Sequence, residues 1–263
     1  MKLLVLPDIH GRQFWREPCK NIDQYDRVIF LGDYLDPYDF EGISVVEAIE
    51  NFNDILSFVS QNREKVVMLL GNHDHPYSSV EYYKLSHWHC RHSREHHDKI
   101  ASMFAEHKNL FTIAHVEDNI LFTHAGCVSD WLDYVFNYKY KDEINLTDLW
   151  LDINGLFQAQ DGLRHLFMIS RHRGGYDPFG SCIWADVYET YLDSANMVNE
   201  DAPQHPIYKV KQVFGHSLRA FEDKDGKIKY GKPVEFRNYK MLDNACAYEL
   251  DTETFTIKNL TRE

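Results

Sequence analysis

The sequence predicts an α/β fold. Three short apolar runs near the N-terminus, at residues 3–6, 28–31 and 66–70, are rich in Val, Ile and Leu and show no alternation. Such runs are typical of strands that are buried on both faces of a sheet. Residues 44–60, between the second and third runs, carry apolar side chains at helical spacing. The order strand, helix, strand predicts βαβ units.

The rest of the chain extends this pattern. Residues 120–123 and 210–214 form two further apolar runs, and residues 247–260 alternate around a polar centre, which predicts a closing hairpin. A length of 263 residues favours a single domain over residues 1–263. Two longer polar stretches, at about 76–108 and 131–206, are expected to be insertions, the first of them helical.

Composition narrows the class of protein. Lys and Arg number 28 against 41 Asp and Glu, a formal charge of −13, which argues against broad binding to nucleic-acid backbones. The five cysteines are scattered and form no C-x-x-C pair, as expected of reduced thiols. No apolar run approaches the ~18 residues that a membrane span needs. We therefore expect a cytoplasmic protein without membrane association.

Polar clusters follow the apolar runs. Ligands of open α/β sheets bind at the carboxyl ends of strands, so these clusters are expected to form one site. Their carboxylate, amide and imidazole groups suit Mn, Fe, Zn or Co. A shared carboxylate, such as that of Asp33, would offset the repulsion between two neighbouring cations. The clusters are Asp8-Ile9-His10-Gly11, Gly32-Asp33-Tyr34-Leu35-Asp36, Gly71-Asn72-His73-Asp74, His124-Ala125-Gly126 and Gly215-His216.

Taken in this order, the five clusters resemble those of the calcineurin-like metallophosphoesterase superfamily. The resemblance runs from Asp8 to His216. It implies a four-layer α/β/β/α sandwich with helical insertions and a hydrolase that acts on phosphoric ester bonds. It also implies a binuclear centre of two divalent or trivalent metal ions, with manganese expected and iron, zinc or cobalt open.

The resemblance implies a role for each matching residue. His73 corresponds to the general acid that protonates the leaving alkoxide, and Asp36 to the carboxylate that orients it. A water activated between the two ions would attack phosphorus in line. The implied metal ligands are Asp8 and His10 on one ion, Asn72, His124 and His216 on the other, and Asp33 on both.

Two departures locate the chain within the superfamily. The run Gly215-His216-Ser217-Leu218 lacks a second histidine, which favours the phosphoprotein phosphatase-like branch. Pro37 stands where that branch usually has an arginine. Guanidinium groups pair bidentately with phosphate oxygens, so Arg171, Arg173 and Arg12 are candidates to bind substrate in its place.

The predicted function is hydrolysis of phosphomonoesters, as in Ser/Thr phosphatases, on a small phosphorylated substrate or a phosphoprotein. A nucleotide or dinucleotide polyphosphate hydrolase or phosphodiesterase is the alternative. A non-catalytic metal-binding scaffold is a different class of function. The histidine at position 73 favours an enzyme, because a scaffold does not need a general acid beside Asn72.

The segment after the third cluster is rich in histidine. His92 and His96 are spaced to share one helix face, which opens the possibility of a third metal. A structural zinc usually has four close ligands, so a solvated insertion that partly faces the pocket is the favoured interpretation. Tyr34 in the second cluster and Tyr77 beside the third either line the pocket or pack against the core. The histidines are His87, His89, His92, His96 and His97.

Overall fold

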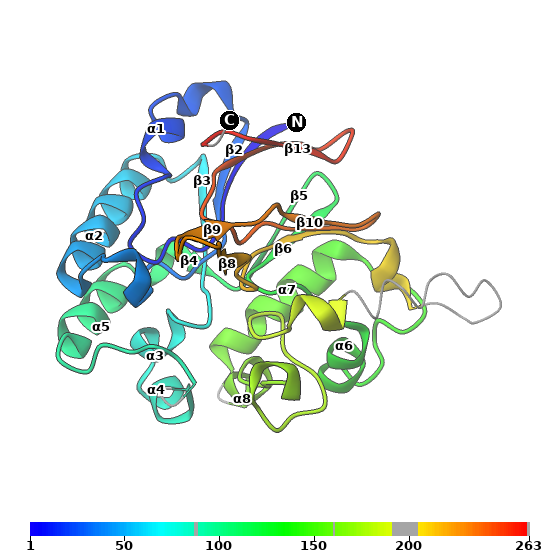
Figure 1. Cartoon of the computed structure of the whole chain (residues 1–263). Coiled ribbons are helices and arrows are strands. Elements are labelled where there is room, and N and C mark those ends of the chain that lie inside the picture. The colour runs from blue at the N-terminus through cyan, green and yellow to red at the C-terminus, as the bar shows by residue number, and fades with distance from the viewer. Residues whose placement is uncertain (87–88, 160, 191–204, 262–263) are drawn as a thin grey trace. The chain divides into compact units, whose positions relative to one another are not determined.

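The computed structural model describes residues 1–86, 89–159, 161–190 and 205–261. They form two compact units, each built around one sheet with its own helices (Figure 1). The predicted α/β class is confirmed, and the single domain with its two insertions stays a prediction. Unit 1 is Met1–Thr112, Leu218–Lys232 and Asp243–Glu263, and unit 2 is Ile113–Ser217 and Pro233–Leu242.

Unit 1 holds a six-stranded sheet in the order β13-β12-β1-β2-β3-β4. The strands β1 to β4 run parallel, while β12 and β13 form an antiparallel hairpin against β1. The three predicted N-terminal strands and the closing hairpin are confirmed. The strands are β1 (Lys2–Leu6), β2 (Arg27–Phe30), β3 (Val66–Leu69), β4 (Phe111–Thr112), β12 (Tyr248–Asp251) and β13 (Thr256–Asn259).

The predicted helix at residues 44–60 is α2 (Val45–Gln61). It begins with a capping box, in which the Ser44 hydroxyl accepts from the Glu47 amide at 3.2 Å and the Glu47 carboxylate accepts from the Ser44 amide at 2.8 Å. Its apolar face packs inward, where the Phe52 ring lies 5.0 Å from that of Phe104 in α5 (His97–Glu106). Figure 1 shows α2 and α5 beside the sheet of unit 1.

Replacement of Ser44 by alanine is expected to destabilise unit 1 by about 1 kcal/mol, because the first turn of α2 loses an acceptor for its free amides. Urea unfolding followed by circular dichroism measures the change. Ser60→Ala, on an exposed site near the end of the same helix, is the matched control and should change stability by less than about 0.5 kcal/mol. Equal effects of the two substitutions would contradict a role for the cap.

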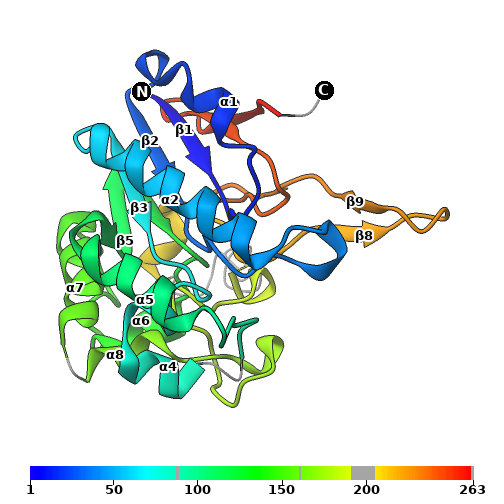
Figure 2. The ribbon, with the colours of Figure 1, turned by 90° about the vertical axis from the view of Figure 1, so that its left-hand side faces the viewer.

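Unit 1 also contains elements that the sequence reasoning missed or left unspecified. The strands β8 (Ala220–Glu222) and β9 (Ile228–Tyr230) form a separate hairpin that projects in Figure 2. Its turn contains Asp225 and Gly226, and the φ of Gly226 is 74°, so the Asp-Gly pair was a usable sequence signal. The short helices are α1 (Arg16–Cys19), α3 (His75–Ser78) and α4 (Val80–Ser86).

Unit 2 holds a five-stranded sheet in the order β10-β11-β7-β6-β5. The predicted strands at 120–123 and 210–214 are β6 and β7, which pair in parallel. The antiparallel partner β5 was missed, although Asp118 and Asn119 form its turn with φ of 48° and 61°. The strands are β5 (Ala114–Glu117), β6 (Ile120–Thr123), β7 (Lys211–Phe214), β10 (Val234–Glu235) and β11 (Tyr239–Met241).

The helices of unit 2 lie within the predicted insertion at 131–206 or just before it. Asn154 fastens α7 to the start of β5, because its side-chain oxygen accepts from the amides of Ile113 and Ala114 at 2.8 and 3.1 Å. Its side-chain amide in turn donates to the Ala114 carbonyl at 3.0 Å. The helices are α6 (Ser129–Val135), α7 (Leu146–Gln158) and α8 (Gly162–Leu166).

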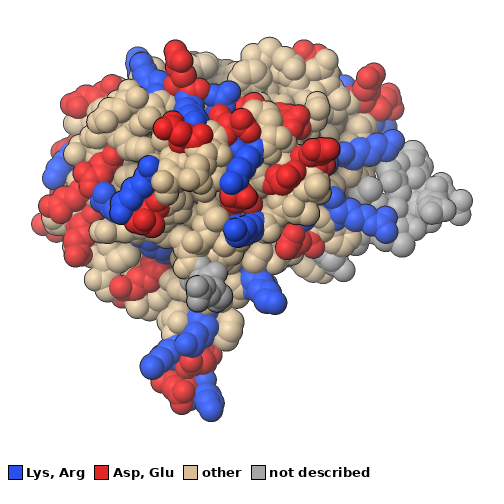
Figure 3. All heavy atoms as spheres, turned by 90° about the horizontal axis from the view of Figure 1, so that it is seen from above, with Lys and Arg blue, Asp and Glu red and all other residues tan. Residues whose placement is uncertain are grey.

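The surface carries charges of both signs. On the face seen in Figure 3, acidic and basic side chains are interspersed, and the described residues there form no continuous basic stripe. None of the helices in the described ranges is long and apolar enough to cross a membrane.

Candidate metal centre

The loops that follow β1 and β2 lie side by side at the carboxyl ends of the parallel strands. The His10 amide donates to the Asp33 carbonyl at 2.6 Å, and the Gly11 amide donates to the Tyr34 carbonyl at 3.1 Å. These bonds continue the ladder beyond the strands. They hold the first two polar clusters together, as the parallel arrangement predicts.

Asp74 ties the third cluster to the second. Its fully buried carboxylate accepts from the amides of Asp33 at 2.7 Å, Tyr34 at 2.9 Å and Gly71 at 2.8 Å. Hydrogen bonds to a charged carboxylate are stronger than neutral ones, so this side chain fixes both loops. Sequence reasoning included Asp74 in the third cluster but gave it no role.

Gly71 leaves room for Asp33. A Cβ built on Gly71 would lie 2.1 Å from the Asp33 carboxylate oxygen Oδ1 and 2.7 Å from the Asp33 amide nitrogen. Both distances are shorter than any real carbon contact. The two loops approach this closely only because position 71 has no side chain.

Replacement of Gly71 by alanine is therefore expected to displace Asp33 and to cost about 1–3 kcal/mol of stability through overpacking. Thermal unfolding and bound-metal content, measured by mass spectrometry, should both fall. Gly155→Ala is the control, since a Cβ there meets nothing within 4 Å and alanine favours helix α7. Unchanged metal content in Gly71→Ala would contradict the close approach.

The backbone is left-handed at several predicted site residues. The φ angles are 44° at His10, 53° at Asp33, 56° at Asp36 and 69° at His216. Few non-glycine residues adopt positive φ, and those that do cluster at functional sites. The surrounding hydrogen bonds hold these residues in place against the local strain.

In the contact between His10 and Asp33, two hydrogen-bond acceptors face each other: Nε2 of His10 and Oδ2 of Asp33. The Nδ1 atom of His10 lies 2.8 Å from the Leu35 carbonyl, which can only accept, so Nδ1 carries the proton. Burial lowers the pKa of His10 well below its usual value, against the attraction of Asp33, so the ring is neutral and Nε2 has a lone pair. That Nε2 lies 3.4 Å from Oδ2 of Asp33. A cation bound by both atoms would satisfy both lone pairs.

His73 completes a group of three potential ligands in unit 1. Ligand atoms of His10, Asp33 and His73 all lie within 4.8 Å of one another, and all three residues are buried. The His73 amide also donates to the Asp33 carboxylate at 2.9 Å. This donor set of imidazole and carboxylate fits a first-row transition metal.

Asp36 orients His73. Its Oδ2 atom lies 2.9 Å from Nδ1 of His73, and its Oδ1 accepts from the Tyr77 hydroxyl at 2.6 Å. Burial raises the pKa of the Asp36 carboxyl, whereas the hydrogen bonds from His73 and Tyr77 lower it. Since Nδ1 of His73 faces the Asp36 carboxylate, the other ring nitrogen, Nε2, points away from Asp36.

Asn72 is 3% exposed and lies beside Cys90. The Cys90 thiol donates to the Asn72 carbonyl at 3.2 Å, and the Asn72 side-chain amide lies 3.8 Å from the sulfur. Burial raises the pKa of the Cys90 thiol well above its usual value, so the thiol stays protonated near neutral pH. Cys90 therefore acts as a packing neighbour of Asn72.

Unit 2 brings His124 and His216 together. They follow β6 and β7, which pair in parallel, and the Gly215 amide donates to the His124 carbonyl at 2.8 Å. The Nε2 atom of His124 lies 3.1 Å from Nδ1 of His216. Two imidazole nitrogens this close can share either one proton or one metal ion.

The three arginines predicted to bind substrate have different surroundings. Arg173 donates to the His216 carbonyl at 3.2 Å and pairs with Asp186 at 3.3 Å, while Arg171 is exposed. Both belong to unit 2. Their role in substrate binding stays a prediction.

Arg12, the third predicted arginine, is buried in unit 1. Its Nε atom donates to the Glu41 carboxylate at 2.8 Å and its Nη1 to the Asp8 carbonyl at 2.9 Å. These contacts brace the loop that carries Asp8. Binding of substrate by Arg12 stays a prediction as well.

Sequence reasoning missed Arg91. Its Nε and Nη2 atoms donate to the Asp36 carbonyl at 3.2 and 3.0 Å, and its Cζ lies 3.6 Å above the Tyr38 ring. The Nη2 atom is 3.5 Å from Nδ1 of His10. No sequence motif marks this arginine, because 55 residues separate it from Asp36.

The histidine-rich segment packs around Tyr77. The ring of His92 lies 4.6 Å from that of Tyr77, and its Nε2 atom is 3.0 Å from Nδ1 of His97. Within the described ranges, none of these histidines joins a group of three close ligand atoms. His87 lies outside the described residues.

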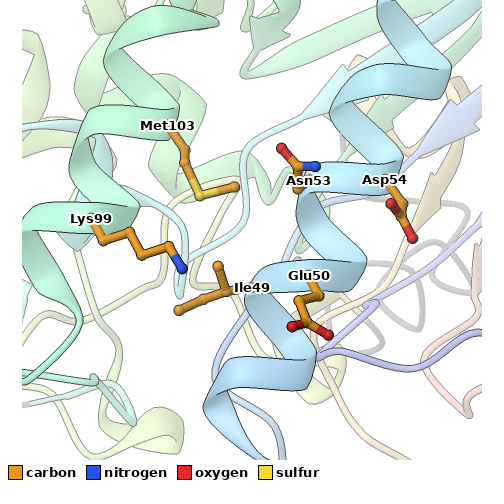
Figure 4. Close-up of a pocket in the computed structure, with 6 residues that line it drawn as sticks. All are labelled: Ile49, Glu50, Asn53, Asp54, Lys99 and Met103. Atoms are coloured by element: carbon orange, nitrogen blue, oxygen red, sulfur yellow. The ribbon is translucent and has the colours of Figure 1, made fainter.

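A hollow of about 560 Å³ lies between α2 and α5 (Figure 4). None of the predicted site residues lines it. Its rim mixes the charges of Glu50, Asp54 and Lys99, with Ile49, Asn53 and Met103 completing the lining.

Comparisons with known proteins identify the family and the fold of the chain. The model of the calcineurin-like phosphoesterase family matches residues 1–219. A cold-active protein-tyrosine phosphatase of a psychrophilic Shewanella species has a similar structure, with a TM-score of 0.53 and 15% identity over 98% of this chain and 80% of that one. A second structure of a cold-active protein tyrosine phosphatase gives 0.55 and 14% over 98% and 78%. A search of curated proteins found no match.

The chain belongs to the calcineurin-like phosphoesterase family. It is a metal-dependent hydrolase that acts on phosphoric esters, and the predicted family and fold are confirmed. The family implies divalent metal ions, and the facing acceptors of His10 and Asp33 fit that requirement.

Proposed function

We propose that the chain hydrolyses phosphomonoesters at a centre of two metal ions, and that these ions are manganese. The observation that carries this proposal is the buried group formed by His10, Asp33 and His73, with Asp36 behind His73. It supplies cation ligands and a paired histidine in one place. Metal-assisted hydrolysis of a phosphoric ester with a histidine as general acid uses both.

The proposed ligands are those expected from the sequence. Bound there, two ions would polarise the phosphoryl oxygens and lower the pKa of a water. The neutral ring of His10 can bind a cation without first losing a proton. The set is Asp8 and His10 on one ion, Asn72, His124 and His216 on the other, and Asp33 on both.

His73 serves as the general acid in this proposal. With Nδ1 donating to Asp36, Nε2 is the ring nitrogen from which a proton would pass to the leaving oxygen. Tyr77 donates to the other oxygen of Asp36 and keeps that carboxylate from turning away. The contacts of this pair favour an enzyme over a metal-binding scaffold.

An assay panel under Mn²⁺ tests the proposal. The substrates are p-nitrophenyl phosphate, phosphoserine and phosphotyrosine peptides, bis-p-nitrophenyl phosphate and a dinucleotide tetraphosphate. We expect the monoesters to be hydrolysed best. Preference for the dinucleotide or the diester would show that the substrates are not phosphomonoesters. Manganese binding without any hydrolysis would indicate a scaffold. Protein purified with the Asp33→Asn substitution controls for contaminating phosphatases.

A further inference from the structure

Arg91 is held rigidly beside the candidate metal centre. Two of its nitrogens, Nε and Nη2, donate to one backbone oxygen, that of Asp36. The flat guanidinium group also stacks on Tyr38, with Cζ 3.6 Å from the ring centroid. Hydrogen bonds and stacking together fix both the plane and the rotation of the group.

This anchoring leaves part of the guanidinium group unused. A guanidinium has five N–H bonds, and the Asp36 carbonyl takes one from Nε and one from Nη2. His10 cannot accept from Nη2, because its Nδ1 proton is given to Leu35. Among the described residues, no hydrogen-bond acceptor of Nη1 is present. The edge formed by Nη1 and Nη2 therefore retains donors.

The neighbours of Arg91 identify the chemistry of a suitable ligand. Nη2 lies 3.5 Å from the ring of His10, and the Arg91 carbonyl lies 3.3 Å from Nδ1 of His73. A permanent cation so close to proposed metal ligands would repel the metal unless an anion lay between them. Paired donors of a guanidinium edge match two oxygens of a phosphoryl group.

From this arrangement we infer that Arg91 binds the phosphoryl group of the substrate and makes the site prefer dianionic monoesters to diesters. The inference rests on the proposed phosphomonoesterase function. A monoester presents three unsubstituted oxygens and two negative charges, whereas a diester presents two oxygens and one charge. The arginine edge and the metal ions together need the larger number of oxygens.

Two variants separate this role from simple bracing of the Asp36 loop. Arg91→Met keeps the length of the side chain without its charge or donors, and Arg91→Lys keeps the charge without the paired edge. Arg94→Met, an exposed arginine three residues away, is the matched control. Arg91→Met also removes the hydrogen bonds to the Asp36 carbonyl, so thermal unfolding is measured for all four proteins to confirm that each is folded at the assay temperature. Bound manganese should be the same in all four.

The decisive readout is kcat/KM for p-nitrophenyl phosphate against bis-p-nitrophenyl phosphate, which share a leaving group. Arg91→Met should lose about 100-fold on the monoester and about tenfold or less on the diester, as expected when one preorganised donor is removed. Arg91→Lys should lie between wild type and Arg91→Met. Equal losses on both substrates, or none on either, would overturn the inference and leave Arg91 as a brace.

Phosphate binding keeps the two proposals distinguishable. If the wild-type protein hydrolyses neither ester, the proposed function fails, and calorimetric titration of the manganese-loaded proteins with inorganic phosphate decides the role of Arg91. Binding to wild type and Arg94→Met, but at least tenfold weaker to Arg91→Met, supports the inference. Equal binding to all three, or none to any, overturns it.

Discussion

Asp33→Asn is expected to lower metal-dependent hydrolysis of p-nitrophenyl phosphate by about a thousandfold, in line with the loss of one key electrostatic group at an active site. Asparagine keeps an oxygen that can accept the His73 amide, so the loop should stay folded. It lacks the negative charge that the proposed ions require. Steady-state kinetics at saturating Mn²⁺, together with bound-metal content by mass spectrometry, measures the effect.

Asp142→Asn controls for the loss of one carboxylate, because Asp142 is exposed and lies outside the candidate centre. It should retain wild-type activity and metal content. Wild-type turnover in Asp33→Asn would remove Asp33 from the ligand set. Low activity with full metal content would instead assign it a role in positioning rather than in binding the ions.

His73→Asn is expected to have an effect that depends on the leaving group. General acids typically contribute about 10²–10⁴-fold, and they matter most when the departing oxygen is strongly basic. A simple alkyl phosphate should therefore lose about 10³-fold in kcat, and p-nitrophenyl phosphate about tenfold. Comparison of kcat for the two esters at pH 7 provides the measurement.

The surroundings of His73 suggest the controls for this experiment. Asp36→Asn should reproduce the same trend more weakly, because the carboxylate acts through the imidazole. His172→Asn changes an exposed histidine of unit 2 and should leave kcat for both esters unchanged. Equal losses on both esters in His73→Asn would point to a metal ligand, a role that its distance from His10 and Asp33 also permits.

Sequence patterns predicted the elements that carry the candidate centre. Strands β1, β2 and β3 are apolar except for Lys2 and Arg27 at the start of the first two, because parallel strands are covered on both faces. Such runs are easily recognised. The position of each polar cluster is then predicted by the end of the strand that precedes it. The short strands β5, β8 and β9 lack continuous apolar runs and were missed, and only their turn residues could have identified them.

The residues that support the centre could not be predicted in this way. Asp74 acts on Asp33 across 41 positions, and Tyr77 and Arg91 act on Asp36 across 41 and 55. No spacing rule connects residues so far apart, since only the folded chain brings them together. Pro37 indicated that an arginine is missing from its usual place. It gave no sign of Arg91, whose guanidinium donates to the carbonyl of Asp36, the residue before Pro37.

The left-handed backbone at His10, Asp33 and Asp36 restricts how this centre can change by mutation. Aspartate, asparagine, histidine and glycine tolerate that conformation, whereas β-branched residues do not and alanine does so at a cost. An alanine scan would therefore combine lost chemistry with backbone strain at these three positions. Substitution by asparagine separates the two effects, and natural variation there should stay within the same short set of residue types.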